Sequence, residues 1–179
     1  TDKEEAVTLA REHRAEARSV EGLLYPHKVA VIGVSRRPGS LGELVVRNVR
    51  TGGFTGSLYA INPEVDEVAG VAAYRSVADA PGPIDLAIVT APINSVSEIV
   101  ADCAAAGVRA IMVISSGFAD LDADGSQRTL GLVAKAREAG MRVIGPEALG
   151  IINNDPRVQL NASLADVVPG RGRIGFFCE

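Results

Sequence analysis

The sequence predicts an α/β fold with a doubly wound, mostly parallel sheet and helices on both faces. Short apolar runs rich in valine and isoleucine alternate with helical stretches from residue 28 onward. The runs lack polar alternation, which indicates strands buried on both faces. A weak repeat, residues 106–111 against 139–144, places a glycine stop and an arginine before each of two runs. Such a sheet binds its ligand at the carboxyl ends of its strands.

The elements follow in order from these patterns. Residues 1–22 are charged and helix-prone, and we predict a linker helix there, followed by one domain over residues 23–179. Strands are predicted at 28–34, 57–61, 84–90, 110–115, 141–144 and 173–178, and helices at about 41–51, 95–106 and 124–139.

Helix boundaries have local signals of their own. The first helix opens at Ser40, whose spacing to Glu43 is that of a capping box. Asn94 or Ser95 with Glu98 starts the second helix, and Gly107 and Gly140 end the second and third helices. The chain begins without Met and stops inside its last apolar run, so we expect a fragment of a longer polypeptide.

Composition excludes several classes of partner. The 179 residues carry 18 basic and 22 acidic side chains, with three Tyr, four Phe and no Trp, which argues against nucleic acid and against a membrane surface. No apolar run reaches membrane-spanning length. The cysteines, Cys103 and Cys178, indicate buried thiols in a reducing compartment, and no Cys/His cluster has metal-binding spacing. We expect a cytoplasmic protein without a metal site.

The segment from residue 28 to residue 42 predicts an anion site. The first apolar run breaks at Gly33 into a short loop, and the next helix begins at Ser40. Glycines let a ligand approach the backbone, and the helix N-terminus offers unpaired N–H groups and a positive dipole end. Arg36 and Arg37 add fixed positive charge. The expected ligand carries phosphates, while an ordinary turn with two solvated arginines stays open as the alternative.

Two common phosphate-binding patterns fit this loop poorly. The fingerprint of NAD(P) sites is Gly-x-Gly-x-x-Gly with an acidic residue at the end of the second strand. Here the loop runs from Gly33 to Gly39 without that spacing, and the second strand ends in Asn62-Pro63, with Glu64 beyond the proline. No Gly-Lys-Ser/Thr of a P-loop occurs. A dinucleotide ligand is therefore the weaker alternative.

Several stretches together resemble a known family. They are residues 29–35 with 38–40, 52–56, 61–63, 83–87, 114–119, 145–146 with 150–153, and 172–176. In this order and spacing they resemble the CoA-binding domain of the NDP-forming acyl-CoA synthetases, the group that includes the α subunit of succinyl-CoA synthetase. The resemblance covers about residues 22–179 and implies a Rossmann-like fold that binds coenzyme A or acyl-CoA.

The resemblance also implies a site, divided into three parts along the CoA molecule. The CoA phosphates would be held by Ser35, Arg36, Arg37, Gly39 and Ser40, and Gly33 is a further cofactor-binding residue at the start of this loop. The adenosine part would be flanked by Asn62, Pro63, Thr90, Ala91 and Pro92. The pantetheine thiol would lie toward Ser115, Ser116, Gly117, Gly145 and Pro146.

The resemblance further implies a non-catalytic fragment of an acid–CoA ligase. The family's phosphohistidine lies in a following domain, so we expect no catalytic residue here, and His13 and His27 as ordinary surface residues. The implied partners are a CoA thioester and the downstream ligase and nucleotide-grasping domains, in the same or a partner chain. Some relatives fuse this module to an acetyltransferase domain.

The chain departs from the family pattern at two acidic residues. Glu64 follows Asn62-Pro63, where the family often has a basic residue, and Glu147 follows Gly145-Pro146, where the family has Asn. The resemblance places Glu147 near the CoA thiol, where a carboxylate repels an acyl phosphate or an anionic acid. This favours one alternative, an acyl-CoA-sensing regulatory module of an acetyltransferase. An NAD(P)-binding Rossmann domain is the other.

Overall fold

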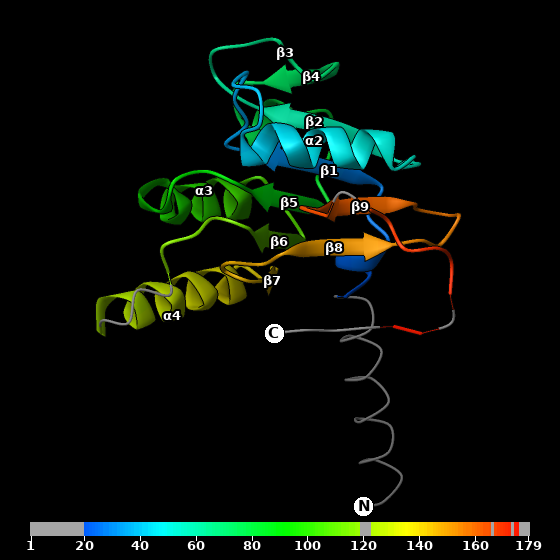
Figure 1. Cartoon of the computed structure of the whole chain (residues 1–179). Helices are drawn as coiled ribbons and strands as arrows, with labels where there is room; N and C mark the ends of the chain where they lie inside the picture. The colour runs from blue at the N-terminus through cyan, green and yellow to red at the C-terminus, as the bar shows by residue number, and fades with distance from the viewer. Residues whose placement is uncertain (1–19, 119–122, 166, 173, 176–179) are drawn as a thin grey trace, which may run out of the picture.

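The computed structural model describes residues 20–118, 123–165, 167–172 and 174–175. In these residues one seven-stranded sheet has the order β3-β4-β2-β1-β5-β6-β7 (Figure 1). Its strands are β1 (Lys28–Ile32), β2 (Ser57–Ile61), β3 (Glu67–Val68), β4 (Val71–Tyr74), β5 (Leu86–Val89), β6 (Ala110–Val113) and β7 (Arg142–Ile144). All neighbouring strands pair in parallel, except that β3 pairs antiparallel with β4. The predicted fold class is confirmed.

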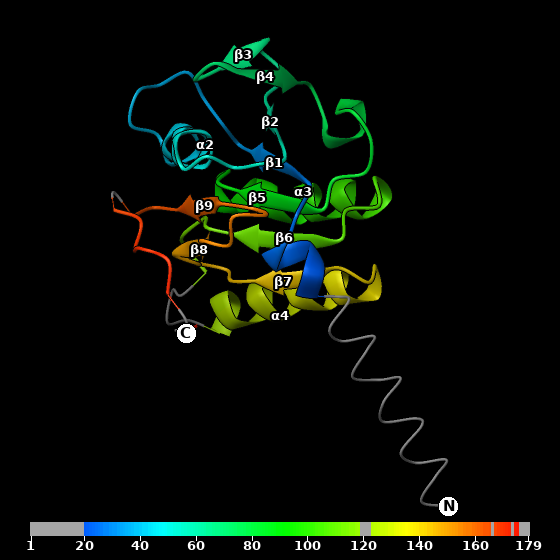
Figure 2. The same ribbon diagram turned by 90° about the vertical axis from the view of Figure 1, so that its right-hand side faces the viewer.

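Both faces of the sheet are covered. The helices are α2 (Leu41–Thr51), α3 (Ile93–Ala105) and α4 (Ala123–Glu138), with a short 3-10 turn η1 (Val77–Asp79). In β1, Val29 and Val31 belong to one core cluster with α2, whereas Ala30 and Ile32 belong to a second cluster with α3 and α4. Figure 2 shows α2 on one side of the sheet and α3 on the other. Burial on both faces explains why the strands read as unbroken apolar runs.

A β-hairpin covers part of the face on which α2 lies. It consists of β8 (Gly150–Asn153) and β9 (Leu160–Ser163), which pair antiparallel beside α2 (Figure 2). Ile151, Leu160 and Ala162 enter the core cluster of α2, and Asn48 of α2 donates from Nδ2 to the carbonyl of Ser163 at 2.9 Å. The hairpin buries the sheet where a further helix would otherwise be needed.

The predicted boundaries hold best where local signals are strong. Both α2 and β2 have the predicted ends, and α4 and the remaining predicted strands of the sheet are each found, shorter or shifted by one or two residues. The predicted start of α3 is wrong: the helix begins at Ile93, with Pro92 as its N-cap and no side-chain cap. Pro92 has an extended ψ of 145°, and its carbonyl accepts from the Ser95 N–H at 2.9 Å, so the backbone alone starts the helix before the polar residues of the predicted cap.

Two predictions reach beyond the described residues. The predicted strand at 173–178 is wrong for residues 174 and 175, which lie in no strand, and its other residues fall outside the described part. The predicted linker helix falls outside it up to residue 19. Residues 20–24 are helical, and Leu23, 6% exposed, packs in the core. None of the helices described is long and apolar enough to span a membrane.

Candidate functional site

The strand order reverses at β1, which pairs with β2 on one side and with β5 on the other. The loop after β1 leads to α2 on one face of the sheet and the loop after β5 leads to α3 on the other face. Folds of this kind bind their ligands at the carboxyl edge, where two such loops diverge. Gly33 lies against Ala91 at this point, and a Cβ added to Gly33 would stand 2.5 Å from the Ala91 backbone nitrogen. Gly33 also has φ +85°, so only glycine fits this contact.

The β1–α2 loop presents a helix N-terminus with two arginines. Ser40 is the N-cap of α2, and its Oγ accepts from the Glu43 backbone N–H at 3.4 Å. Glu43 in turn accepts from the Gly39 N–H at 3.3 Å, so the predicted capping box is confirmed, with its return bond one residue before the cap. Arg36 and Arg37 are exposed. The remaining first-turn N–H groups of α2 have no intrahelical partner, which leaves a donor-rich, positively charged loop.

Side chains tie the loops that follow β1, β2, β5, β6 and β7 at the carboxyl edge of the sheet, here called the rim, to neighbouring strands. Asn62, after β2, donates from Nδ2 to the carbonyl of Val34 at 2.5 Å. Thr90, after β5, donates from Oγ1 to the carbonyl of Ile32 at 3.0 Å. Ser115, after β6, donates from Oγ to the carbonyl of Val89 at 3.4 Å. Each bond crosses from one strand end to the next, so the rim is held in place by the protein itself.

Glu147 makes the last of these cross-links. Its Oε1 accepts from the backbone N–H groups of Gly117 at 2.9 Å and of Phe118 at 3.1 Å. The loop after β7 is fixed by the Ala148 N–H, which donates to the carbonyl of Val113 at 3.0 Å. Glu147 has φ +61°, in the left-handed region that non-glycine residues rarely adopt. The carboxylate therefore joins the loops after β6 and β7.

The structure brings the residues predicted from the sequence to one edge of the sheet, but some are exposed there and others use their polar atoms within the protein. Arg36, Arg37, Pro92 and Ser116 are exposed there, as are Gly33, Gly39, Pro63 and Gly145. Ser115 is buried and bonded internally, and Asn62 and Thr90 also use polar atoms within the protein. Asn62 in addition accepts from the Glu64 N–H at 2.7 Å. These three side chains position the loops, and direct contact with a ligand stays a prediction.

Sequence reasoning did not find the cross-link made by Glu147. An acidic residue after Gly-Pro was visible as a departure from a family pattern, but its partners come from a loop 30 residues earlier in the chain. Only the parallel pairing of β6 with β7 brings those two loops together.

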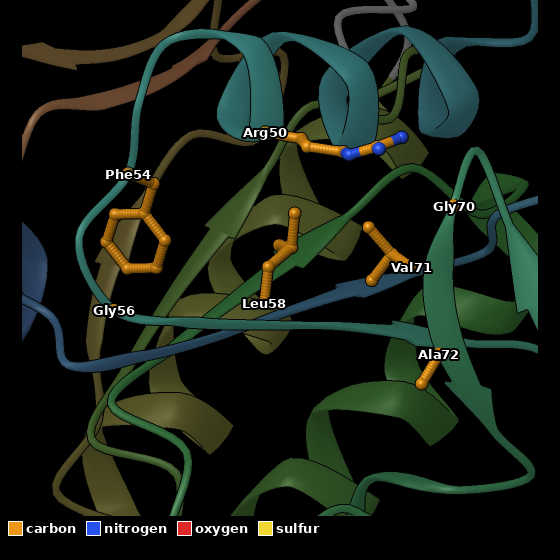
Figure 3. Close-up of a pocket in the computed structure, with 7 residues that line it drawn as sticks. All are labelled: Arg50, Phe54, Gly56, Leu58, Gly70, Val71 and Ala72. Carbon is orange, nitrogen blue, oxygen red and sulfur yellow. The ribbon is translucent and has the colours of Figure 1, made fainter.

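A separate cavity of about 310 Å³ lies away from this edge. Figure 3 shows it between the end of α2 and the first residues of β2 and β4, with Phe54, Leu58 and Val71 around it. Arg50 lies across it and donates from Nη1 to the carbonyl of Ala69 at 2.7 Å. The cavity is at the amino half of the strands, so it is no part of the carboxyl edge.

Neither a nucleophilic thiol nor a metal centre is found among the described residues. Cys103 is fully buried in α3, and burial raises the pKa of its thiol to about 12, with a smaller contribution from Asp102. The described part of the chain holds no group of three or more His, Cys, Asp or Glu side chains placed for a metal ion. The groups that the rim offers, exposed arginines and backbone N–H donors, are suited to binding a ligand.

Comparison with known proteins agrees with this description. A family model described as "CoA binding domain" matches residues 27–154. The ADP-forming acetate–CoA ligase I of Archaeoglobus fulgidus is 37% identical over 160 residues, which are 89% of this chain and 23% of that protein. The ADP-forming 4-hydroxybutyrate–CoA ligase of Nitrosopumilus maritimus is 34% identical over 157 residues, 88% of this chain and 22% of that protein. The chain thus spans less than a quarter of the length of either relative.

Solved structures show the same likeness. The dinucleotide-forming acetyl-coenzyme A synthetase 1 of Ca. Korarchaeum cryptofilum, in complex with phosphate and ADP, superposes with a TM-score of 0.77 at 36% identity. The match covers 84% of this chain and 32% of that one.

Proposed function

Because the chain belongs to the CoA-binding domain family, we propose that coenzyme A lies along the carboxyl edge of its sheet, with the phosphates at the β1–α2 loop and the thiol toward the loops after β6 and β7. The observation that carries this placement is the close approach of Gly33 to the Ala91 backbone at the end of β1, beside the N-terminus of α2. A sheet of this kind binds its ligand at such a switch point.

The charge of the rim supports this direction of binding. Arg36 and Arg37 lie at the β1 end, where phosphates need cations and N–H donors. The carboxylate of Glu147 lies at the β7 end. The two ends are three strand spacings apart, or about 14 Å. The extended pantetheine arm of CoA is suited to cross that distance over the small residues of the rim.

We further propose that the chain serves as the CoA site of an acid–CoA ligase that forms a nucleoside diphosphate. The relatives carry that activity in their names, and this chain corresponds to one part of them. The reaction then requires the ligase and nucleotide-grasping domains of the same or a partner chain. This segment supplies binding, not a catalytic residue. A cytoplasmic location stays a prediction.

The two alternatives predict different behaviour. An NAD(P) site needs an acidic side chain at the end of β2, where Asn62 instead donates to Val34 and caps the following turn. A regulatory module that senses acyl-CoA would bind the same ligand without ligation. None of the relatives named above is an acetyltransferase.

Calorimetric titration of the chain with CoA and with NADH tests the proposal. We expect CoA to bind more tightly than NADH, because the rim has phosphate donors but no ribose carboxylate. Tighter binding of NADH would overturn the assignment. In the parent protein, CoA-dependent formation of a nucleoside diphosphate separates the ligase from the sensor.

A further inference from the structure

The turn after β6 forms a small anion-binding unit. The N–H groups of two successive residues, Gly117 and Phe118, converge on one oxygen atom. Backbone N–H groups arranged in this way bind anions in many proteins. Ser115 and Phe118 are 3% and 6% exposed, so packing fixes both ends of the turn. The direction of the two donors is therefore set by the fold and does not depend on the ligand.

In this structure the anion is supplied by the protein. The Glu147 carboxylate accepts both N–H groups, and its own loop is held by the Ala148–Val113 backbone bond. A bond from a backbone N–H to a carboxylate is shorter and stronger than one between neutral groups. This interaction offsets the left-handed backbone at Glu147. The anion site is thus filled, and the rim carries a negative charge where the thiol end of CoA is proposed to lie.

We infer that Glu147 is a specificity-determining residue that makes the β6–β7 end of the rim accept uncharged acyl groups and disfavour acyl groups with a second carboxylate. The inference rests on the proposed direction of CoA binding. An acyl carboxylate can use neither donor, because Glu147 occupies both, and it meets the like charge of Glu147 instead. A neutral acyl chain meets no such repulsion. Exposed Leu149, two residues on, adds apolar surface to the same loop.

Butyryl-CoA and succinyl-CoA form a matched pair for testing this inference, since both have four-carbon acyl groups and only the second has a free carboxylate. Calorimetry should show succinyl-CoA binding about fivefold more weakly, the size expected for like charges near a wet surface. The ratio of the two dissociation constants should approach one in 0.5 M salt, because salt screens the repulsion. Equal affinities at low salt would overturn the inference.

Two variants separate the role of Glu147 from a general charge effect. Glu147→Gln keeps an oxygen acceptor for the two N–H groups and removes the charge, so the ratio should fall to about one. Glu64→Gln removes an exposed charge from the loop after β2 and should leave the ratio unchanged. A ratio that stays near five in Glu147→Gln, or that falls equally in both variants, would contradict the assignment. If neither thioester binds, the proposed function itself fails.

Discussion

At the scale of single residues, the rim separates side chains that position the backbone from those that face solvent. Asn62, Thr90 and Ser115 all donate to main-chain carbonyls of the rim. Arg36 and Arg37 are exposed, and their charge is available to a ligand. The three polar side chains should affect ligand affinity through the geometry of the loops, whereas the two arginines should affect it by direct contact with the ligand.

Replacing Arg36 and Arg37 together by Ala should weaken CoA binding by about tenfold and flatten its salt dependence. Each hydrogen bond to a charged group contributes about 1.5–3 kcal/mol, reduced here because solvent and salt screen exposed groups. Calorimetry at several salt concentrations measures both effects. The matched control is Lys135→Ala with Arg137→Ala, which removes two exposed charges from α4. Equal affinities for the arginine double variant and native protein would mean that the arginines are merely solvated.

At the scale of elements, the N-terminus of α2 combines a stabilising cap with a proposed phosphate site, and two substitutions of Ser40 can separate these roles. Ser40→Ala should lower the free energy of unfolding by about 1 kcal/mol, because the Glu43 N–H loses its acceptor. Ser40→Asp retains an acceptor and should stay within about 0.5 kcal/mol of native stability. Its added charge should weaken CoA about tenfold.

Urea denaturation and CoA titration of both Ser40 variants measure the two effects. Native CoA affinity in a stable Ser40→Asp protein would show that the phosphates do not lie at this helix end.

The contact between the loop after β1 and the loop after β5 determines how much stability is lost when a glycine of the first loop is replaced. Gly33→Ala should destabilise the protein by about 3 kcal/mol or more, because its Cβ would meet the Ala91 backbone and its φ is +85°. Gly39→Ala is the matched control: its φ is +78°, but no atom lies within 4 Å of the added Cβ. It should cost only about 1–2 kcal/mol, the conformational penalty alone. Similar losses in thermal or urea unfolding would contradict the close contact.

The sequence predicts an element well when the interactions that form it are between residues close in the chain, and poorly when they are between distant segments. The start of α2 is predicted because Ser40 and Glu43, which form its cap, are close in sequence, and β2 is predicted because its apolar run is continuous. The sequence did not predict the β8–β9 hairpin, because β8 has only one buried residue, Ile151, and the hairpin is stabilised by packing on α2. Likewise the loop containing Glu147 was placed on the rim, but the partners of its carboxylate depend on β6–β7 pairing.

At the scale of the whole molecule, the sheet separates two cores that lie on its opposite faces. Cys103 belongs to the core built with α3 and α4 and is fully buried. Because burial keeps its thiol neutral, its modification requires that this core open. Cys103 therefore reports on the integrity of the core on the face covered by α3 and α4.

In a Cys178→Ser background, Cys103 should resist a thiol-specific disulfide reagent until urea unfolds the protein. Its pKa is raised from 9.0 to about 12, so it should also make stability fall as pH rises between those values. In that range the unfolded thiol ionises and the folded thiol does not. Comparison with Cys103→Ala isolates this contribution from other groups that titrate there. Rapid native-state modification would place the thiol at the surface.

The bonds that tie the rim loops together decide which partner loses conformational freedom on binding. The backbone of these loops is already ordered by Asn62, Thr90, Ser115 and Glu147, so little entropy is lost on the protein side. The cost falls on the flexible arm of the ligand. The adenosine and phosphate portion of CoA, which is stiffer, should therefore retain most of the affinity of the whole cofactor, and the arm should contribute direction more than strength.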